Sequence, residues 1–371
     1  MEKSLSWLGT NVGTLLRINE TSKKGDGMPA RLVQIYPYPR ISNVSSVSSA
    51  EVARSSASSR LRLLRLSITD RCNFRCRYCM PAEGTPNVAH HDLLPLESLV
   101  ELVRWLVVHS GIDRVRLTGG EPLLRTGVAH LIAGLSAIAG VREISLTTNG
   151  SLLPRMAWSL KAAGLNRVNV SLDSLNEQRF AEVTRGGSLK NTLAGIAAAL
   201  EAGLTPIKLN TVLRRSTWKQ ELPSLLDYSA QTGFEIRFIE LMRTGTERAW
   251  CEAEFISADE VCEGLDVAMF PVEEQTRASA KRISLDWHGT RVAVGWITPR
   301  SQPFCRRCDR LRMDARGQIR RCLMDSMQFD LSSMLNATDG GATERDFNSY
   351  LAGKVPPRAM DCALAMSQIG G

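Results

Sequence analysis

The sequence predicts an α/β fold that combines a parallel sheet with a smaller C-terminal α+β module. Between residues 63 and 242, six short apolar or β-branched runs alternate with amphipathic segments of helical period. This alternation favours parallel strands joined by right-handed crossovers. Polar motifs stand at the C-terminal ends of the runs. Barrels and open α/β sheets both bind ligands there, so the motif positions leave both architectures open.

The individual elements follow from these patterns in chain order. The six runs predict strands at residues 63–69, 114–118, 144–148, 168–172, 207–213 and 235–242. The segments between them predict helices at residues 96–109, 128–137, 156–163, 189–202 and 219–232. After residue 242 the pattern weakens. We expect one domain over residues 61–254 and a second over residues 255–371, with antiparallel strands at 282–286 and 291–297 around the turn His288-Gly289. Residues 343–361 predict a helix and a proline-terminated tail.

Residues 1–60 show little periodicity, and residues 42–59 are rich in Ser, Ala and Val. This composition predicts a flexible N-terminal extension. An organelle transit peptide would also be Ser-rich and Arg-bearing, but Glu2 and Glu20 count against that alternative.

The overall composition is ordinary for a globular protein, with 43% apolar and 23% charged residues. No run reaches the ~18 apolar residues of a membrane span, and a net charge of +8 is a weak signal for nucleic acid. Six of the nine cysteines fall into two tight sets with metal-ligand spacing, and no apolar secretory signal is visible. We therefore expect a reducing, cytoplasmic compartment and no membrane or nucleic-acid partner.

The first cysteine set is Cys72, Cys76 and Cys79, spaced CxxxCxxC directly after the first apolar run. Three thiolates can hold three corners of an iron-sulfur cube and leave the fourth iron open to a small molecule, unlike closed four-cysteine electron-transfer sites. The alternatives are a zinc site with a distant fourth ligand and buried thiols that only pack. The close spacing favours a catalytic cluster.

The second set is Cys305, Cys308 and Cys322, in which thirteen residues follow a CxxC pair. This spacing is common in zinc ribbons, so a zinc site completed by Cys251, Cys262, Cys362 or His288 is the main alternative. If the site holds a cube, one corner is again open. Two half-open cubes in one chain suggest that one activates a cofactor while the other holds a substrate.

Arginines around the second set indicate the kind of substrate. Seven arginines occur between residues 306 and 321. Arg310 and Arg312 alternate and would face one side of a strand, where two guanidinium groups suit phosphate oxygens. For Arg306, Arg307, Arg316, Arg320 and Arg321, we expect solvated surface positions.

Several motifs in this order resemble those of known proteins. They are LSITDRCNFRCRYCMP at 66–81, LTGGEPLLR at 117–125, LTTNG at 146–150, NVSLD at 169–173, EIRFIE at 235–240, FCRRCDRLR at 304–312 and the terminal Gly370-Gly371. The chain resembles radical S-adenosylmethionine enzymes and, among them, the GTP 3′,8-cyclase family of molybdenum cofactor biosynthesis. The resemblance implies a partial six-stranded TIM-like (β/α)6 barrel, with a second iron-sulfur cluster in the C-terminal module.

The same resemblance implies the site residues. Cys72, Cys76 and Cys79 would hold one 4Fe-4S cluster, and Cys305, Cys308 and Cys322 the other. S-adenosylmethionine would meet Tyr78, Gly120, Ser171 and Met242. GTP would meet Arg65, Arg116, Thr147, Lys208, Arg310, Leu311 and Arg312. Arg310, Arg312, Gly370 and Gly371 would be catalytic, the last two through a tail that reaches the active site.

The implied reaction begins with a 5′-deoxyadenosyl radical, formed when the reduced first cluster cleaves S-adenosylmethionine. This radical would take hydrogen from C3′ of GTP, and C3′ would then join C8 to give (8S)-3′,8-cyclo-7,8-dihydroguanosine 5′-triphosphate. The resemblance also implies an electron donor, cyclic pyranopterin monophosphate synthase as the next enzyme, and a monomer or homodimer.

Two rival functions are less favoured. A peptide-modifying radical enzyme usually has more cysteines in its second module. A metal-ribbon RNA-binding protein would interleave aromatic residues with its basic ones, and residues 306–321 contain none.

Overall fold

The computed structural model describes residues 61–86, 88–244, 247–272, 279–336 and 340–354, together with the short strands β1 (Trp7–Gly9), β2 (Thr14–Leu16), β3 (Val33–Ile35) and β17 (Asp361–Cys362). The chain forms two compact units, Met1–Ser48 and Ser49–Gly371. In the first unit, β1, β2 and β3 form an antiparallel sheet. The rest of the predicted extension over residues 1–60 lies outside the described residues.

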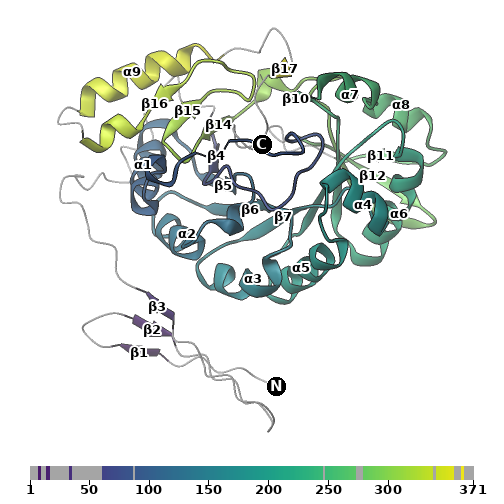
Figure 1. The fold of residues 1–371 in the computed structure, drawn as a ribbon, viewed down its shortest axis with the longest axis horizontal. Coiled ribbons are helices and arrows are strands. Elements are labelled where there is room, and N and C mark those ends of the chain that lie inside the picture. Colours follow the sequence, from purple (N-terminus) through teal and green to yellow (C-terminus); the bar gives the residue numbers. More distant parts are fainter. Residues whose placement is uncertain are drawn as a thin grey trace. The chain divides into compact units, whose positions relative to one another are not determined.

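All six predicted strands are confirmed, as β4 (Leu63–Ser67), β5 (Arg114–Thr118), β6 (Glu143–Thr148), β7 (Arg167–Ser171), β8 (Lys208–Val212) and β9 (Glu235–Ile239). Neighbouring strands from β4 to β9 are parallel and lie in chain order (Figure 1). The predicted parallel α/β sheet is therefore confirmed.

The two faces of this sheet differ in chemistry. On β4, Leu64 and Leu66 are fully buried, and Leu117 on β5 and Leu209 on β8 are buried in the same way. Because side chains alternate across a strand, Arg65 points to the opposite face. The apolar face packs against helices, which lie along the outer side of the curved sheet in Figure 1. The polar face is left for the interior.

The five predicted helices are confirmed, as α1 (Leu96–Ser110), α2 (Val128–Ser136), α3 (Leu153–Ala162), α5 (Leu189–Glu201) and α6 (Trp218–Thr232). In α1, the buried residues Leu99, Leu102, Val103 and Leu106 recur at helical spacing. The helix ends at Gly111, whose φ of 72° is the left-handed conformation that glycine adopts without strain.

One helix was not predicted, α4 (Glu177–Thr184). It begins at Asn176, whose side chain accepts a hydrogen bond from the backbone N–H of Arg179. Its buried residues Phe180, Val183 and Thr184 cover only one turn, which is too short a pattern to stand out in the sequence.

The predicted antiparallel pair is confirmed as β12 (Lys281–Trp287) and β13 (Thr290–Ile297). The turn residues His288 and Gly289 both have positive φ, 50° and 77°, as tight hairpin turns require. β13 pairs in parallel with β9, so this hairpin extends the main sheet at one edge, where β11 (Met269–Pro271) is the last strand.

The strands that follow extend the other edge of the sheet. β14 (Arg310–Met313) pairs in parallel with β4, and β15 (Gln318–Arg320) and β16 (Phe329–Asp330) follow it as antiparallel strands. The C-terminal part therefore adds strands to both edges of one twelve-stranded sheet in the described part of the chain. The predicted domain boundary between residues 254 and 255 stays a prediction.

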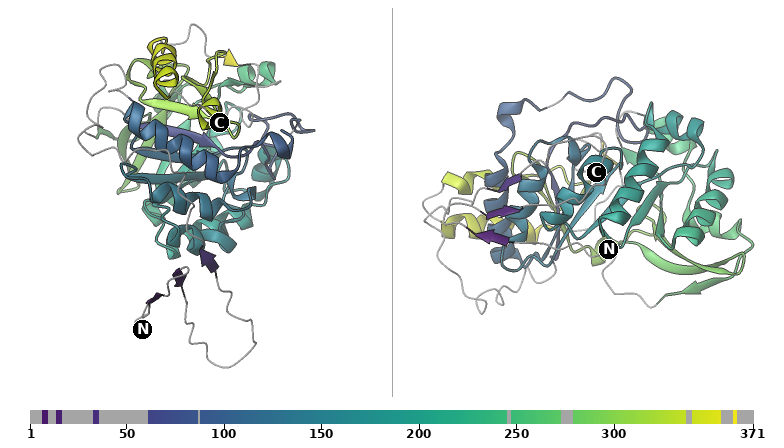
Figure 2. Two further views of the ribbon diagram at one scale, coloured as in Figure 1. Left: turned by 90° about the vertical axis from the view of Figure 1, so that its left-hand side faces the viewer. Right: turned by 90° about the horizontal axis from the view of Figure 1, so that it is seen from below.

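The remaining elements are short, apart from α9 (Gly340–Ala352), which begins three residues before the predicted C-terminal helix region at 343–361. The others are β10 (Arg243–Thr244), α7 (Arg248–Ala253), α8 (Ala258–Glu263) and the 3-10 turns His90–Asp92, Pro122–Leu124, Cys305–Arg307 and Ser332–Asn336. α9 lies beside α1 (Figure 2). Phe347 on α9 meets Trp105 on α1 edge to face, with ring centroids 5.1 Å apart. Among the described helices, none is long and apolar enough to cross a membrane.

Candidate active site

The first cysteine set lies in the loop that follows β4. Backbone N–H groups of Cys79 and Met80 donate to the carbonyl of Cys76 at 2.8 and 3.1 Å, which closes a turn between the cysteines. The N–H groups of Arg75 and Arg77 donate to carbonyls at the end of α4, each at 3.0 Å. The last carbonyls of a helix lack partners within the helix. The unpredicted helix α4 therefore holds the cysteine loop by its backbone.

The three cysteines are half-buried, and none of them forms a disulfide bond. Burial raises the pKa of Cys72 to about 11. Burial also raises the pKa of Cys76, and Asp173 and the thiols of Cys79 and Cys72 raise it further. Ionising these thiols therefore requires a positive partner, and metal ions are the usual one. The N–H of Phe74 donates to Cys72 Sγ at 3.4 Å, a contact of the kind that stabilises cluster thiolates. The residues thus fit an iron-sulfur cluster.

The second cysteine set is also brought together. Cys305 lies in the 3-10 turn Cys305–Arg307, the N–H of Cys308 donates to the carbonyl of Cys305 at 3.2 Å, and Cys322 follows β15. Burial raises the pKa of Cys305, and the thiols of Cys322 and Cys308 raise it further. The N–H of Met324 donates to Cys322 Sγ at 3.5 Å. These three cysteines therefore also fit an iron-sulfur cluster that is held by thiolates. In the described part of the chain, no group of three or more His, Cys, Asp or Glu side chains is arranged to hold a single metal ion.

Between the two sets runs a row of basic side chains on the polar face. Arg312, Arg65 and Arg116 are direct partners across β14, β4 and β5, and Ser145 on β6 continues the row. Arg116 Nε donates to Ser145 Oγ at 3.3 Å. We call Arg312, Arg65 and Arg116 the arginine row.

Mutual repulsion marks the arginine row as a place for an anion. Burial lowers the pKa of Arg65, and the charges of Arg312, Arg116 and Arg310 lower it further. Burial and neighbouring arginines lower the pKa of Arg116 to about 9 and that of Arg312 to about 10. Gathering like charges in a poorly solvated interior costs free energy, which a bound anion would offset.

A second basic group continues the polar face on β8 and β9. Glu235 Oε2 accepts from Lys208 Nζ at 3.1 Å, and its Oε1 accepts from Arg237 Nε at 2.6 Å. Arg282 Nη2 forms an ion pair with Glu235 Oε2 at 3.1 Å. Burial and the Arg237 charge lower the pKa of Lys208 to about 8, against the opposing effect of Glu235. Thr147 is in register with Asn169, and Asn169 with Lys208, so the predicted residues Thr147 and Lys208 share one row.

Comparison with known proteins is informative at this point. The Radical SAM superfamily model matches residues 66–228, and the Molybdenum Cofactor Synthesis C model matches residues 234–357. The GTP 3′,8-cyclase of Moorella thermoacetica is 43% identical over 323 residues, which cover 84% of this chain and 98% of that protein. The GTP 3′,8-cyclase of Peptoclostridium acidaminophilum is 46% identical over 278 residues, covering 74% of this chain and 84% of that protein. The chain belongs to the GTP 3′,8-cyclase family.

Solved structures add information on the fold alone. The crystal structure of Streptococcus suis SuiB bound to precursor peptide SuiA aligns with a TM-score of 0.55 at 14% identity and covers 80% of this chain and 66% of that one. SuiB bound to S-adenosylmethionine aligns equally well at 12% identity, over 78% of this chain and 68% of that one. The chain therefore has a mixed α/β fold with a parallel sheet of the radical SAM type.

In this member of the GTP 3′,8-cyclase family, Gly120 makes a close backbone approach. A Cβ at this position would lie 2.2 Å from the carbonyl oxygen of Arg71, so only glycine fits. Its own N–H donates to the carbonyl of Thr69 at 2.8 Å. Glycine at this position therefore allows the chain after β5 to approach the cysteine loop closely.

Glu121, next to it, is a buried acid that the sequence reasoning did not single out. Its carboxylate accepts from Thr148 Oγ1 at 2.7 Å and from the N–H groups of Asn149 and Leu123 at 2.8 and 3.1 Å. Burial raises its pKa to about 7, against the effect of these donors. Asn149 Nδ2 also donates to Asn73 Oδ1 at 2.8 Å, which connects this network to the cysteine loop.

The other predicted contacts of S-adenosylmethionine lie at the C-terminal ends of strands. Ser171 ends β7, and Met242 follows β9. Tyr78 lies in the cysteine loop, and Thr244 Oγ1 donates to its carbonyl at 3.3 Å. Two buried oxygens, Thr118 Oγ1 and Asn210 Oδ1, have no hydrogen-bond partner in the described part of the chain. Thr118 ends β5, and Asn210 is the register partner of Ser171. A polar ligand at this edge would satisfy both.

Some predictions fall elsewhere. Gly370, Gly371 and the side chain of Cys362 lie outside the described residues. Of the alternative zinc ligands, Cys251 is buried in α7, Cys262 lies in α8 and His288 lies in the β12–β13 turn. Glu235, Arg237 and Arg167 lie among the charged side chains on the polar face of the sheet and were not predicted. Their one sequence signal was the alternation of charged and apolar residues in EIRFIE and RVNVS.

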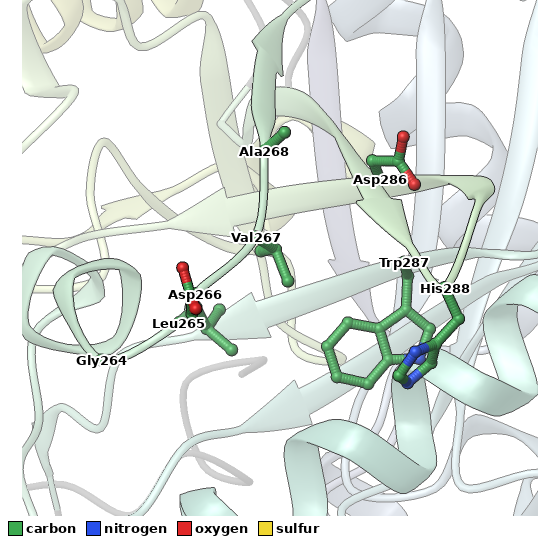
Figure 3. Close-up of a pocket in the computed structure, with 8 residues that line it drawn as sticks. All are labelled: Gly264, Leu265, Asp266, Val267, Ala268, Asp286, Trp287 and His288. Carbon is green, nitrogen blue, oxygen red and sulfur yellow. The ribbon is translucent and has the colours of Figure 1, made fainter.

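An open hollow lies away from these residues, between the chain segment after α8 and the β12–β13 turn (Figure 3). Trp287 and His288 line it on one side, and Asp266 and Val267 on the other. Trp287 is held by its Nε1, which donates to Asp227 Oδ1 at 2.7 Å. None of the predicted site residues lines this hollow, apart from the alternative zinc ligand His288.

Proposed function

We propose that this chain catalyses the radical cyclisation of GTP to (8S)-3′,8-cyclo-7,8-dihydroguanosine 5′-triphosphate, the first step of molybdenum cofactor biosynthesis. The GTP 3′,8-cyclase family to which it belongs carries the activity in its name, and the Molybdenum Cofactor Synthesis C region agrees with the pathway. The curved parallel sheet would form the family's partial six-stranded barrel.

The observation that best supports this proposal is the position of the two cysteine sets at opposite ends of the paired strands β4 and β14. Cys308 precedes β14, whose first residue pairs with Leu63 at the start of β4. Cys72 follows the end of the same strand. β4 spans five residues, which separates the two edges by roughly 13 Å at ~3.3 Å per residue. Arg65 stands midway, so a charged substrate could extend between two cofactor sites.

The arginine row would bind the triphosphate. Two unit charges about 4 Å apart attract by ~1 kcal/mol in water but by ~4 kcal/mol at the effective dielectric of a protein site. Arg310, Leu311 and Lys208 would complete the GTP site, with Thr147 near the sugar or base. By holding C3′ at a fixed place, these residues would contribute mainly through proximity and orientation.

The first cysteine set would hold a 4Fe-4S cluster, and Tyr78, Gly120, Ser171 and Met242 would surround S-adenosylmethionine. When bound, this cofactor pair supplies the radical that takes hydrogen from C3′. The second set would hold the cluster that meets the guanine. The roles of Gly370 and Gly371, a separate electron donor and cyclic pyranopterin monophosphate synthase as the next enzyme stay predictions.

The test of this function is isotopic. The clusters are reconstituted anaerobically in the chain, which is then mixed with dithionite, S-adenosylmethionine and GTP deuterated at C3′. The deuterium content of the 5′-deoxyadenosine formed is measured by mass spectrometry. Deuterium in that product is the expected result. Unlabelled 5′-deoxyadenosine in an amount that GTP does not change would contradict the cyclase. Cys79→Ala, which removes one ligand of the first cluster, is the control that should form none.

A further inference from the structure

Lys354 follows the end of α9 and lies against the second cysteine set. Its Nζ is 3.8 Å from Cys308 Sγ and also donates to the backbone carbonyl of Arg321, the residue before Cys322. One ammonium group thus contacts one cysteine directly and the neighbour of another. Figure 1 shows α9 beside β15, which precedes Cys322 in the chain, and β16, which follows it.

The neighbours of Lys354 fix its position. Arg321 forms a two-bond ion pair with Asp325 at 2.6 and 3.1 Å and packs over the ring of Tyr350 at 4.5 Å. Tyr350 Oη in turn donates toward the carbonyls of Ile319 and Met327, each at 3.1 Å. The end of α9 and the loop of Cys322 therefore form one hydrogen-bonded unit.

The charge of Lys354 is directed at the cysteines. Among the described residues, no carboxylate forms an ion pair with Lys354, and its two hydrogen-bond acceptors are a sulfur and a carbonyl. It therefore differs from Arg321, whose charge is paired with Asp325. A cation that is held beside a thiolate, and that has no counter-charge of its own nearby, changes the electrostatic potential at the metal group that the thiolate binds.

We propose that Lys354 tunes the second cluster by stabilising its reduced state through the contact with Cys308. Reduction adds one electron to a cluster, and hence one negative charge. A fixed ammonium beside a ligating sulfur lowers the energy of the more negative state and so raises the reduction potential. This inference rests on the proposed second cluster. It makes Lys354 a positioning and tuning residue that acts through Cys308, without contact with the substrate.

The test is a redox titration of the second cluster, followed by electron paramagnetic resonance, in the anaerobically reconstituted full-length chain. Cys72, Cys76 and Cys79 are replaced by alanine in the parent and in every variant, so that the signal belongs to the second set. Lys354→Gln and Lys354→Met remove the charge and should give a more negative midpoint potential. Lys354→Arg keeps the charge and should stay close to the parent.

Tyr350→Phe is the matched control, because it loosens the same helix from the same loop and leaves the charge of Lys354 in place. Its potential should equal that of the parent. The inference is wrong if the uncharged Lys354 variants titrate at the parent potential. It is equally wrong if Tyr350→Phe shifts the potential as far as they do, because the effect would then be structural.

Iron analysis covers the other outcomes. If neither uncharged variant assembles the cluster while Lys354→Arg and Tyr350→Phe do, the charge is required for cluster assembly, and the proposed tuning role is wrong. If Tyr350→Phe also loses the cluster, the role is structural and the proposal falls. Equal iron in the parent with and without Cys305→Ala would show that no second cluster is held, which overturns that part of the proposed function and this inference with it.

Discussion

The hydroxyl of Tyr78 donates a hydrogen bond of 2.6 Å to Asp173 Oδ2 and so connects the first cysteine loop to the end of β7. Asp173 is almost fully buried, and its other oxygen accepts from the N–H of Val212 at 2.9 Å. Burial raises the pKa of Asp173, and the bond from Tyr78 opposes that rise. The ring of a predicted S-adenosylmethionine contact is thus fixed from behind by an acid that has no other side-chain donor among the described residues.

Tyr78→Phe should lower the free energy of unfolding by about 1–3 kcal/mol, because it leaves a buried carboxylate oxygen without its donor. Asp173→Asn should cost less, since an uncharged amide is easier to bury and still accepts from Val212. Thermal or denaturant unfolding of the anaerobic protein measures both. Equal stability of wild type and Tyr78→Phe would mean that this bond contributes nothing. Equilibrium dialysis should also show weaker S-adenosylmethionine binding by Tyr78→Phe.

Arg116→Met should stabilise the nucleotide-free protein and weaken GTP binding. It removes one of several charges that repel one another in the arginine row. It also removes a charged donor from the proposed GTP site, which should cost roughly 10- to 100-fold in affinity. Arg114→Met is the control on the same strand. Arg114 pairs with Asp309 at 3.0 Å, so its loss should lower the melting temperature and leave GTP binding unchanged. Calorimetry of GTP binding and thermal melts check both variants, and a destabilised Arg116→Met would contradict the repulsion.

Most of the fold could be predicted from the sequence, because the six strands are β-branched or apolar runs that end at polar residues. The hairpin could be predicted for a similar reason, since His288-Gly289 favours a tight turn. It was the partners of the later strands that could not be predicted. The pairing of β13 with β9 and of β14 with β4 joins distant segments, and local periodicity says nothing about which strands will meet.

In the candidate site, too, local features could be predicted from the sequence, whereas contacts between distant segments could not. Spacing alone indicated both cysteine sets, and alternation placed Arg310 and Arg312 on one side of a strand. The role of α4 in holding the cysteine loop, and that of Glu235 in joining Lys208, Arg237 and Arg282, depend on contacts between separate strands and helices. A charged residue on a strand gives no sign in the sequence of the partner it will find.

Lys208 should give GTP binding and stability opposite responses to alkaline pH. Its pKa of about 8 in the folded chain lies below the usual 10.5. As the pH rises through about 8, the ammonium loses its proton and GTP affinity should fall, by at most tenfold per pH unit. Between about 8 and 10.5 the unfolded chain binds more protons at this residue than the folded chain, so its contribution to stability rises with pH. GTP affinity from pH 7 to 9 and melting temperature up to pH 10 measure the two responses.

Lys208→Met should remove both responses, while Lys219→Met, on the surface of α6, should keep them. Lys219 lies with its ammonium 5.7 Å from the ring centre of Trp218, which is a contact within its own helix. A GTP affinity that falls equally with pH in wild type and Lys208→Met would assign the titration to another group.

Glu247 should slow the loss of iron from the first cluster. Its carboxylate pairs with Arg77, inside the cysteine loop, at 2.8 Å, and also with Arg185, which follows α4. Arg77 packs over the ring of Trp250 at 4.5 Å, so the loop is fastened to the start of α7. These groups are partly exposed, and exposed ion pairs are worth about 1 kcal/mol or less, so Glu247→Gln should change the melting temperature little.

Local opening of the loop is a different matter, because it requires this clamp to break while the sheet stays folded. Glu247→Gln should therefore release iron to a chelator several-fold faster than wild type and show faster amide exchange over residues 72–80. Glu101→Gln removes a comparable pair with Arg104 in α1 and should leave both rates unchanged. If the two variants release iron at the same rate, the clamp has no part in retaining the cluster, and the backbone bonds from the end of α4 are sufficient to hold the loop.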